Sequence, residues 1–158
     1  MAGNIFQNYG SADQAITITL NSLGSASQRQ STYLANTGTY PYTDAQVQVL
    51  IVEASGASGS GYVDVYAYGS SYGTSNFTDV CTGSDAAFAG NLANLVKLGR
   101  INFTAASQTK IGGPWSLAMA FGGTPPQYWG IVVDNETGAA LASSGCSVWY
   151  QGAFGQYS

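Results

Sequence analysis

One pentapeptide of the chain matches the pattern of a serine nucleophile. Residues 69–73 read Gly-Ser-Ser-Tyr-Gly, which fits the G-x-S-x-G turn that carries the reactive serine of many hydrolases. Such a serine needs a histidine base to accept its proton and a helix directly after the turn. The chain contains no histidine, and no helical pattern follows residue 73. We therefore interpret the pentapeptide as a glycine-rich hairpin loop.

Carboxylates are the other groups in the chain with the chemistry to catalyse a reaction or hold a metal ion. They form two sets that are close in sequence, Asp79 with Asp85 and Asp134 with Glu136. Calcium takes roughly six to eight oxygen ligands, of which residues 134–138 supply only some, and Asp, Asn and Gly in that order also favour a turn. A glycosidase pair requires two carboxyl groups in one cleft with separated pKa values, and nothing in the spacing indicates one. We predict a turn at 134–138, with no catalytic residue, no metal and no cofactor.

Charged residues are scarce along the whole chain. They make up 8% of the sequence, against about 25% in an average domain, and the net charge is −4. The only cations are Arg29, Lys97, Arg100 and Lys110. Four scattered cations are too few to neutralise a phosphate backbone, so we predict no direct binding to nucleic acid.

The chain shows no pattern of export or of membrane insertion. Its first residues lack a basic stretch followed by an apolar run, and no segment approaches the roughly 18 consecutive apolar residues of a membrane span. We therefore expect synthesis in a cytoplasm and no contact with a membrane. Cys81 and Cys146 are far apart in sequence, no pairing is indicated, and we predict two free, mostly buried thiols.

A row of tyrosines is the most suggestive recognition surface in the sequence. Tyr62, Tyr66 and Tyr68 alternate along one predicted strand with Asp64 among them. Tyrosine offers a large contact area with a polar tip, which favours recognition surfaces. Cross-strand packing accounts for the same residues, because aromatic side chains also stabilise sheets. Both interpretations stay open here, whereas the three tryptophans lie inside strand patterns and are interpreted as packing residues.

Alternation of apolar and polar residues predicts strands from one end of the chain to the other. The predicted strands are residues 16–20, 46–52, 62–68, 95–103 with a bulge at Gly99, 115–121, 128–133 and 146–151, with a weaker one at 31–35. The one helical turn that we predict is at 84–89, with Ser84 as its cap. About eight short strands separated by glycine-rich turns indicate an all-β, antiparallel β-sandwich, jelly-roll-like, with another Greek-key sandwich as the alternative.

The two ends of the chain differ from the middle. We expect an N-terminal arm at 1–13, a sandwich domain at 14–151 and a C-terminal tail at 152–158. The arms are otherwise polar but carry aromatic and apolar residues: Ile5, Phe6, Tyr9, Phe154 and Tyr157. Terminal segments are ordered only when something holds them, so these residues predict docking, either onto the protein's own sandwich or onto a neighbouring subunit.

Several runs of the chain resemble small virion proteins of tailed bacteriophages. These runs are residues 15–20, 61–69, 129–138 and 148–152. Within that group, the size and character of the chain are most similar to a capsid decoration, or cement, protein. The resemblance implies a β-rich homo-oligomer, with a trimer favoured, that binds the major capsid protein at high copy number on the exterior of the virion. It provides no catalytic residues.

A function of another class is also open. A carbohydrate-binding module of a tail or fibre would recognise a host glycan during adsorption, using the tyrosine row as a stacking surface. The position of Tyr62, Tyr66 and Tyr68 distinguishes the two: exposure in a groove favours a glycan, and burial between copies favours assembly.

Overall fold

The computed structural model describes residues 5–39, 41–55 and 60–157. In this part of the chain, 11 strands form two antiparallel sheets. Sheet A consists of β1 (Ile5–Tyr9), β2 (Gln14–Ala15), β5 (Asp44–Val52), β9 (Thr109–Ser116) and β11 (Ser147–Tyr157). Sheet B consists of β3 (Ser27–Gln30), β4 (Leu34–Ala35), β6 (Tyr62–Ser70), β7 (Ala86–Ala87), β8 (Val96–Asn102) and β10 (Tyr128–Glu136). The two helical segments are a 3-10 turn, η1 (Leu92–Asn94), and α1 (Leu117–Ala120).

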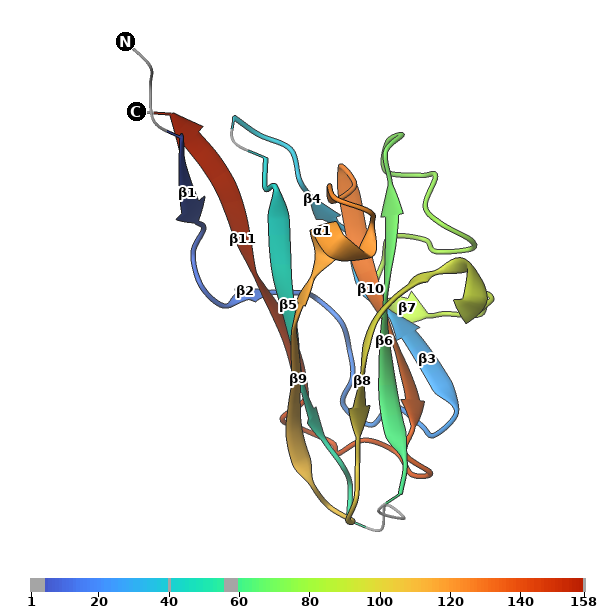
Figure 1. Cartoon of the computed structure of the whole chain (residues 1–158). Helices are drawn as coiled ribbons and strands as arrows, with labels where there is room; N and C mark the ends of the chain where they lie inside the picture. Colours follow the sequence, from blue (N-terminus) through green and yellow to red (C-terminus); the bar gives the residue numbers. More distant parts are fainter. Residues whose placement is uncertain (1–4, 40, 56–59, 158) are drawn as a thin grey trace.

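The sheets pack face to face as a β-sandwich (Figure 1). Sheet A has the order β1-β11-β5-β9, and sheet B has the order β7-β3-β10-β6-β8. Most neighbours are distant in sequence, as they are in Greek-key and jelly-roll sandwiches. The predicted all-β, antiparallel sandwich is confirmed. Three of the strands, β2, β4 and β7, have only two residues each, and the remaining eight match the expected number.

The core lies between the two sheets and is built by strict alternation in the central strands. Val47, Val49 and Ile51 of β5 are fully buried, and their neighbours in the strand face outward. Val63 and Val65 of β6 meet them from sheet B. Burying one such side chain is worth about 1.5–3 kcal/mol, so this double layer of branched residues contributes strongly to stability.

The predicted strand at 16–20 is wrong, although its alternation is real. Ile16 and Leu20 are buried and the segment is extended. However, the Ile16 N–H donates to the carbonyl of Val148 in sheet A, while the Thr17 carbonyl accepts from the Thr32 N–H that follows β3. The segment therefore crosses from one sheet to the other and forms no ladder with either.

Two expectations about helices also differ from the structure. The predicted strand at 115–121 ends at Ser116, whose hydroxyl accepts a hydrogen bond from the Met119 N–H and so caps α1. The predicted helical turn at 84–89 is wrong. Asp85 there accepts hydrogen bonds from Thr19 and Arg29, and the next two residues pair with β3 as β7.

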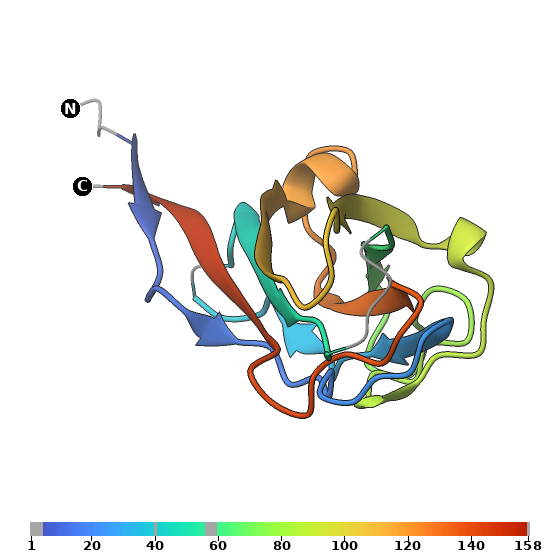
Figure 2. The same ribbon diagram turned by 90° about the horizontal axis from the view of Figure 1, so that it is seen from below.

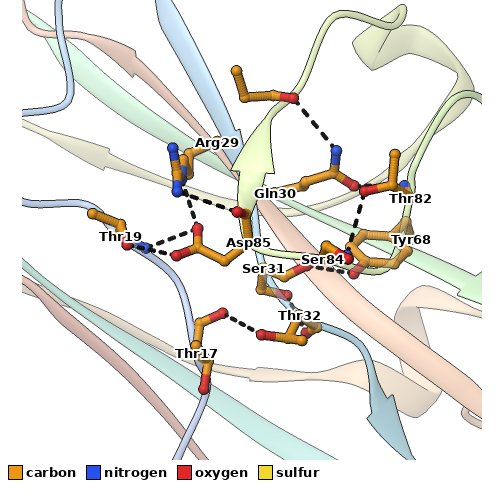
Figure 3. Close-up of polar contacts among 11 residues, drawn as sticks. Thr17, Thr19, Arg29, Gln30, Ser31, Thr32, Tyr68, Thr82, Ser84 and Asp85 are labelled. Carbon is orange, nitrogen blue, oxygen red and sulfur yellow. Dashed lines mark hydrogen bonds and ion pairs between the residues drawn. The ribbon is translucent and has the colours of Figure 1, made fainter.

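Residues 71–95, called here the covering segment, close one end of the outer face of sheet B. The segment contributes Phe77, Cys81, Phe88 and Leu95 to a second apolar cluster. Asp85 and Thr82 fasten it to the sheet: Asp85 accepts from Arg29 Nε at 2.6 Å, and the Thr82 N–H donates to Gln30 Oε1 at 2.8 Å (Figure 3). At the other end of this outer face, Tyr62 and Tyr66 are half-buried.

Both cysteines are free thiols, as predicted. Cys81 lies in the second apolar cluster, and Cys146 is half-buried beside β5. Burial raises the pKa of Cys81 to about 12, and the neighbouring Asp79 adds to this rise. Because thiols react as thiolates, the raised pKa keeps Cys81 protonated at neutral pH and makes it a poor nucleophile.

Candidate functional site

The two ends of the chain form one structural unit. Strand β1 pairs antiparallel with the last part of β11, from Ile5 opposite Tyr157 to Tyr9 opposite Ala153. The other edge of β11 pairs with β5 only as far as Ala153. These two segments, 5–9 and 153–157, therefore make a two-stranded extension of sheet A, called here the terminal ribbon. The ribbon stands away from the sandwich in both views (Figures 1 and 2).

The ribbon combines a free strand edge with exposed aromatic side chains. In the described part of the chain, β1 pairs with β11 alone, so its outer row of N–H and C=O groups has no partner strand. Phe6 is 52% exposed and Tyr9 is 63% exposed. An isolated two-stranded ribbon is marginally stable in water, and a free apolar edge is a template for pairing with another chain.

An aromatic row leads from the core onto this ribbon. The ring centroids of Trp129 and Tyr150 are 5.3 Å apart, those of Tyr150 and Tyr42 are 6.2 Å apart, and those of Tyr42 and Phe154 are 6.3 Å apart. Phe154 is half-buried. The apolar layer that fills the sandwich thus continues past its edge, where no second sheet covers it.

Of the five arm residues predicted as an interface, three have described side chains. Phe6 and Tyr9 are exposed and Phe154 packs on Tyr42, as given above. Ile5 and Tyr157 are paired through their backbones, and their side chains lie outside the described part of the structure. The arms dock onto each other, and the predicted boundary at residue 151 falls inside β11.

The tyrosine row is divided by the covering segment. Tyr62 and Tyr66 lie half-buried at the other end of the outer face of sheet B, whereas Tyr68 is completely buried. The Tyr68 hydroxyl donates to the carbonyl of Ser31 at 2.7 Å (Figure 3). The ring of Tyr68 packs edge-on against that of Phe77, with 5.3 Å between the ring centroids. Of the two interpretations left open for the tyrosine row, packing therefore applies to Tyr68, and the hypothesis that Tyr68 is an interface residue is wrong.

A charged cluster surrounds the two remaining tyrosines. Arg100 binds Asp64 through two nitrogens, Nε at 2.6 Å and Nη2 at 2.7 Å, and Lys97 Nζ binds the same carboxylate at 2.6 Å. The guanidinium carbon of Arg100 lies 3.6 Å from the ring centroid of Tyr62. Burial raises the pKa of Asp64, but the bonds from Arg100 and Lys97 outweigh burial, so the pKa lies below its ordinary value.

A bulge brings the two cations to the same side. Arg100 pairs with Asp64, Gly99 with Val65 and Lys97 with Tyr66, so β8 carries one extra residue at this point. Residues three apart in a regular strand point to opposite faces, and the extra residue turns Lys97 and Arg100 to one face. The bulge predicted at Gly99 is confirmed. The Cβ of an alanine at Gly99 would lie 2.3 Å from the Trp115 ring, so glycine is required there.

The segment predicted as a turn at 134–138 is mostly strand. Asp134, Asn135 and Glu136 are the last residues of β10, and the turn begins at Thr137. Asn135 is completely buried and organises the turn: its amide nitrogen donates to the carbonyls of Leu23, Gly24 and Ala139. These bonds give Asn135 a structural role.

No family model matches the chain, and no curated protein matches it. Within the described ranges, no helix has the length and apolar character needed to cross a membrane, and no three His, Cys, Asp or Glu side chains are grouped as metal ligands would be.

Proposed function

We propose that this protein is a non-enzymatic virion structural protein that binds the outside of a bacteriophage capsid as a decoration protein. The observation that carries the proposal is the terminal ribbon, with its free edge and its exposed Phe6 and Tyr9. We propose the major capsid protein as the partner because residues 15–20, 61–69, 129–138 and 148–152 resemble small phage virion proteins. The assembly that we propose is a homo-oligomer, with a trimer favoured.

The ribbon suits docking on physical grounds. A strand added to the edge of β1 would satisfy its free backbone groups, which is the general mode of β-augmentation. Burying Phe6 and Tyr9 would add apolar area at roughly 25 cal/mol per Å². A low charge on the rest of the surface limits unspecific attraction to other partners.

Stabilisation of the capsid would follow from mass action. A protein that binds only the assembled shell stabilises it in proportion to its occupancy. In an oligomer, several ribbons would bind one particle together, and linked contacts raise the overall affinity by about 100-fold or more. Weak individual contacts are then sufficient for nearly complete occupancy.

The first experiment counts the protein in purified phage particles by quantitative mass spectrometry. We expect a copy number comparable to that of the major shell protein. A handful of copies would place the protein in the tail and favour the alternative, a carbohydrate-binding adsorption module. Absence from the particles would overturn the virion proposal.

The second experiment tests the ribbon itself. Particles that lack the protein are incubated with the wild type or with the double variant Phe6→Ser, Tyr9→Ser, and co-sedimentation is measured. We expect the double variant, and a deletion of residues 1–12, to lose binding while the sandwich stays folded by circular dichroism. Ile111→Ser on β9 is the matched control, because Ile111 is 59% exposed but remote from the ribbon in the sheet order. Equal binding by all of these proteins would contradict the role of the ribbon.

The tyrosine row gives less support to the glycan alternative. Tyr68 is buried, and the Arg100 guanidinium lies over one face of Tyr62. The Lys97 ammonium lies 5.6 Å from the ring centroid of Tyr66. Two half-buried rings already paired with cations are a poor platform for a sugar.

A further inference from the structure

A polar hollow on the outer face of sheet A is separate from both surfaces described above. Its volume is about 200 Å³, and it lies on the strands β11 and β5. Its floor is made by four side chains that are partners in the register, Trp149 opposite Gln48 and Gln151 opposite Gln46. Asp13 and Pro114 form parts of its rim.

The amides of this hollow are held in place by bonds to the protein. Gln48 Oε1 accepts a hydrogen bond from the Trp149 indole nitrogen at 3.2 Å. Gln151 Nε2 donates to the carbonyl of Gly10 at 3.1 Å, and Gln46 Nε2 donates to Asp44 Oδ2 at 2.7 Å. Because one end of each amide is engaged, its other end has a fixed direction. Such preorganisation reduces the entropy cost of binding.

The unused ends of these amides form a mixed set of donors and acceptors. No described residue engages Gln48 Nε2, Gln46 Oε1 or Gln151 Oε1, so the hollow offers one NH2 donor and two carbonyl acceptors. Asp13 adds a carboxylate acceptor at the rim. Beside them, the half-buried indole of Trp149 supplies an apolar surface.

We propose that this hollow is a binding site for a neutral saccharide. Sugar hydroxyls donate and accept at once, which matches fixed amides and a carboxylate, and the C–H face of a sugar ring can lie on the indole. An anionic ligand would meet the charge of Asp13, and an apolar ligand would leave the amides unpaired at a cost of about 1–3 kcal/mol for each buried group. The volume is below the roughly 300–1,000 Å³ of pockets for drug-sized ligands, which indicates a single ring. The proposal stands independently of binding to a capsid.

The test is an NMR titration of the full chain with single neutral sugars: glucose, galactose, mannose, rhamnose and N-acetylglucosamine. We expect at least one sugar, at millimolar concentration, to shift the indole resonance of Trp149 and the side-chain amide resonances of Gln48 and Gln151. No shift with any of these sugars, or shifts confined to the region of Tyr62 and Tyr66, would overturn the proposal.

Variants then assign the interaction to the hollow. Trp149→Ala is expected to weaken binding about tenfold or more, as removal of a central aromatic contact does in other interfaces. Because Trp149 is half-buried and its loss affects packing, Gln48→Ala and Asp13→Asn serve as milder variants, and we expect each to weaken binding at unchanged thermal stability. Asparagine is used at residue 13 because Asp13 has a φ of 55°, which asparagine tolerates better than alanine. Ile111→Ala, on the same face but outside the lining, is the matched control. Binding that is unchanged in all three hollow variants would contradict the assignment.

Discussion

Asp64 and Asp134 are partners in the register of β6 and β10, so two carboxylates lie directly opposite each other on the outer face of sheet B. Both cations of the cluster, Lys97 and Arg100, bind Asp64. Asp134 is 5% exposed and has Glu136 two residues further along its own strand. Burial raises the pKa of Asp134, Glu136 and Asp64 raise it further, and a hydrogen bond from Gln28 opposes the rise. The pKa of Asp64 is thus lowered and the pKa of Asp134 is raised.

Replacing Asp134 by asparagine should stabilise the protein at neutral pH. Like charges directly opposite in a sheet cost up to about 1 kcal/mol, and Asp134→Asn removes one of them. A group whose pKa is raised in the folded state makes the wild type more stable as the pH falls from neutral through that pKa. Urea unfolding at several pH values should therefore show a larger free energy of unfolding for the variant than for the wild type at pH 7. This difference should disappear near pH 4. A less stable variant at pH 7 would contradict this account.

Tyr68→Phe should destabilise the fold, whereas Tyr66→Phe should not. The Tyr68 hydroxyl is buried and bonds the Ser31 carbonyl at 2.7 Å, so its loss leaves that carbonyl with one partner fewer and costs about 1–2 kcal/mol. The Tyr66 hydroxyl is 3.4 Å from Asp64 Oδ2 at a half-buried position, and we expect a change below about 0.5 kcal/mol. Chemical denaturation of the two variants measures the free energy of unfolding of each. An equal loss of stability in both variants would contradict the structural role of the Tyr68 hydroxyl.

Asp85→Ala should loosen the covering segment. Asp85 accepts from Thr19 Oγ1, the Thr19 N–H and Arg29 Nε, and hydrogen bonds to a charged group are worth about 1.5–3 kcal/mol. Burial raises the pKa of Asp85, but the bonds from Arg29 and Thr19 outweigh it, so the pKa is lowered. Its stabilising contribution is therefore present above pH 3.8 and is lost as the pH falls through the folded-state pKa.

The measurement for Asp85→Ala is amide hydrogen exchange together with urea unfolding. We expect faster exchange in residues 81–88 at pH 7, and a stability difference from the wild type that shrinks on acidification below pH 3.8. Exchange that accelerates uniformly over the sandwich would show that Asp85 does not act locally.

Gly99→Ala should damage the bulge of β8. The added Cβ would lie 2.3 Å from the Trp115 ring, and overpacking of this kind costs about 1–3 kcal/mol. Gly24→Ala is the matched control, because the nearest atom to its Cβ is the movable Ser27 hydroxyl at 3.2 Å. Thermal unfolding compares the two, and an equal melting temperature for both variants would contradict the requirement for glycine at 99.

The sequence predicted the elements whose two faces differ in environment. Alternation in 46–52 and 62–68 indicated β5 and β6 correctly, because one face of each strand meets the core and the other does not. The same pattern misassigned 16–20, since burial alternates in any extended segment, whether or not it has a partner strand. The alternation of apolar and polar residues therefore indicates which side chains are buried, but not whether the segment pairs with another strand.

The parts that sequence missed depend on contacts between distant residues. Tyr62, Tyr66 and Tyr68 lie on the same face of β6. The covering segment, which Asp85 fastens to Thr19 66 residues away, buries Tyr68 and leaves the other two half-buried. The glycine at 99 predicted the bulge, but not that the bulge would bring Lys97 and Arg100 to one carboxylate. A signal for the hollow was present: Gln46 and Gln48 occupy outward positions of a predicted strand, where their amides face solvent.

The pairing of the two chain ends has a mechanical consequence. Ile5 and Tyr157 are the outermost of five residue pairs, so a force that pulls these ends apart acts on one pair at a time, from Ile5–Tyr157 toward Tyr9–Ala153. Such peeling needs far less force than shearing all pairs together. From Ala153 back toward Ser147, β11 pairs with β5, and its Trp149 and Tyr150 also pair with β2, so the force is then carried by the sandwich. Under tension, the residue pairs of the terminal ribbon would thus separate one after another, and the molecule would lengthen before the core is strained.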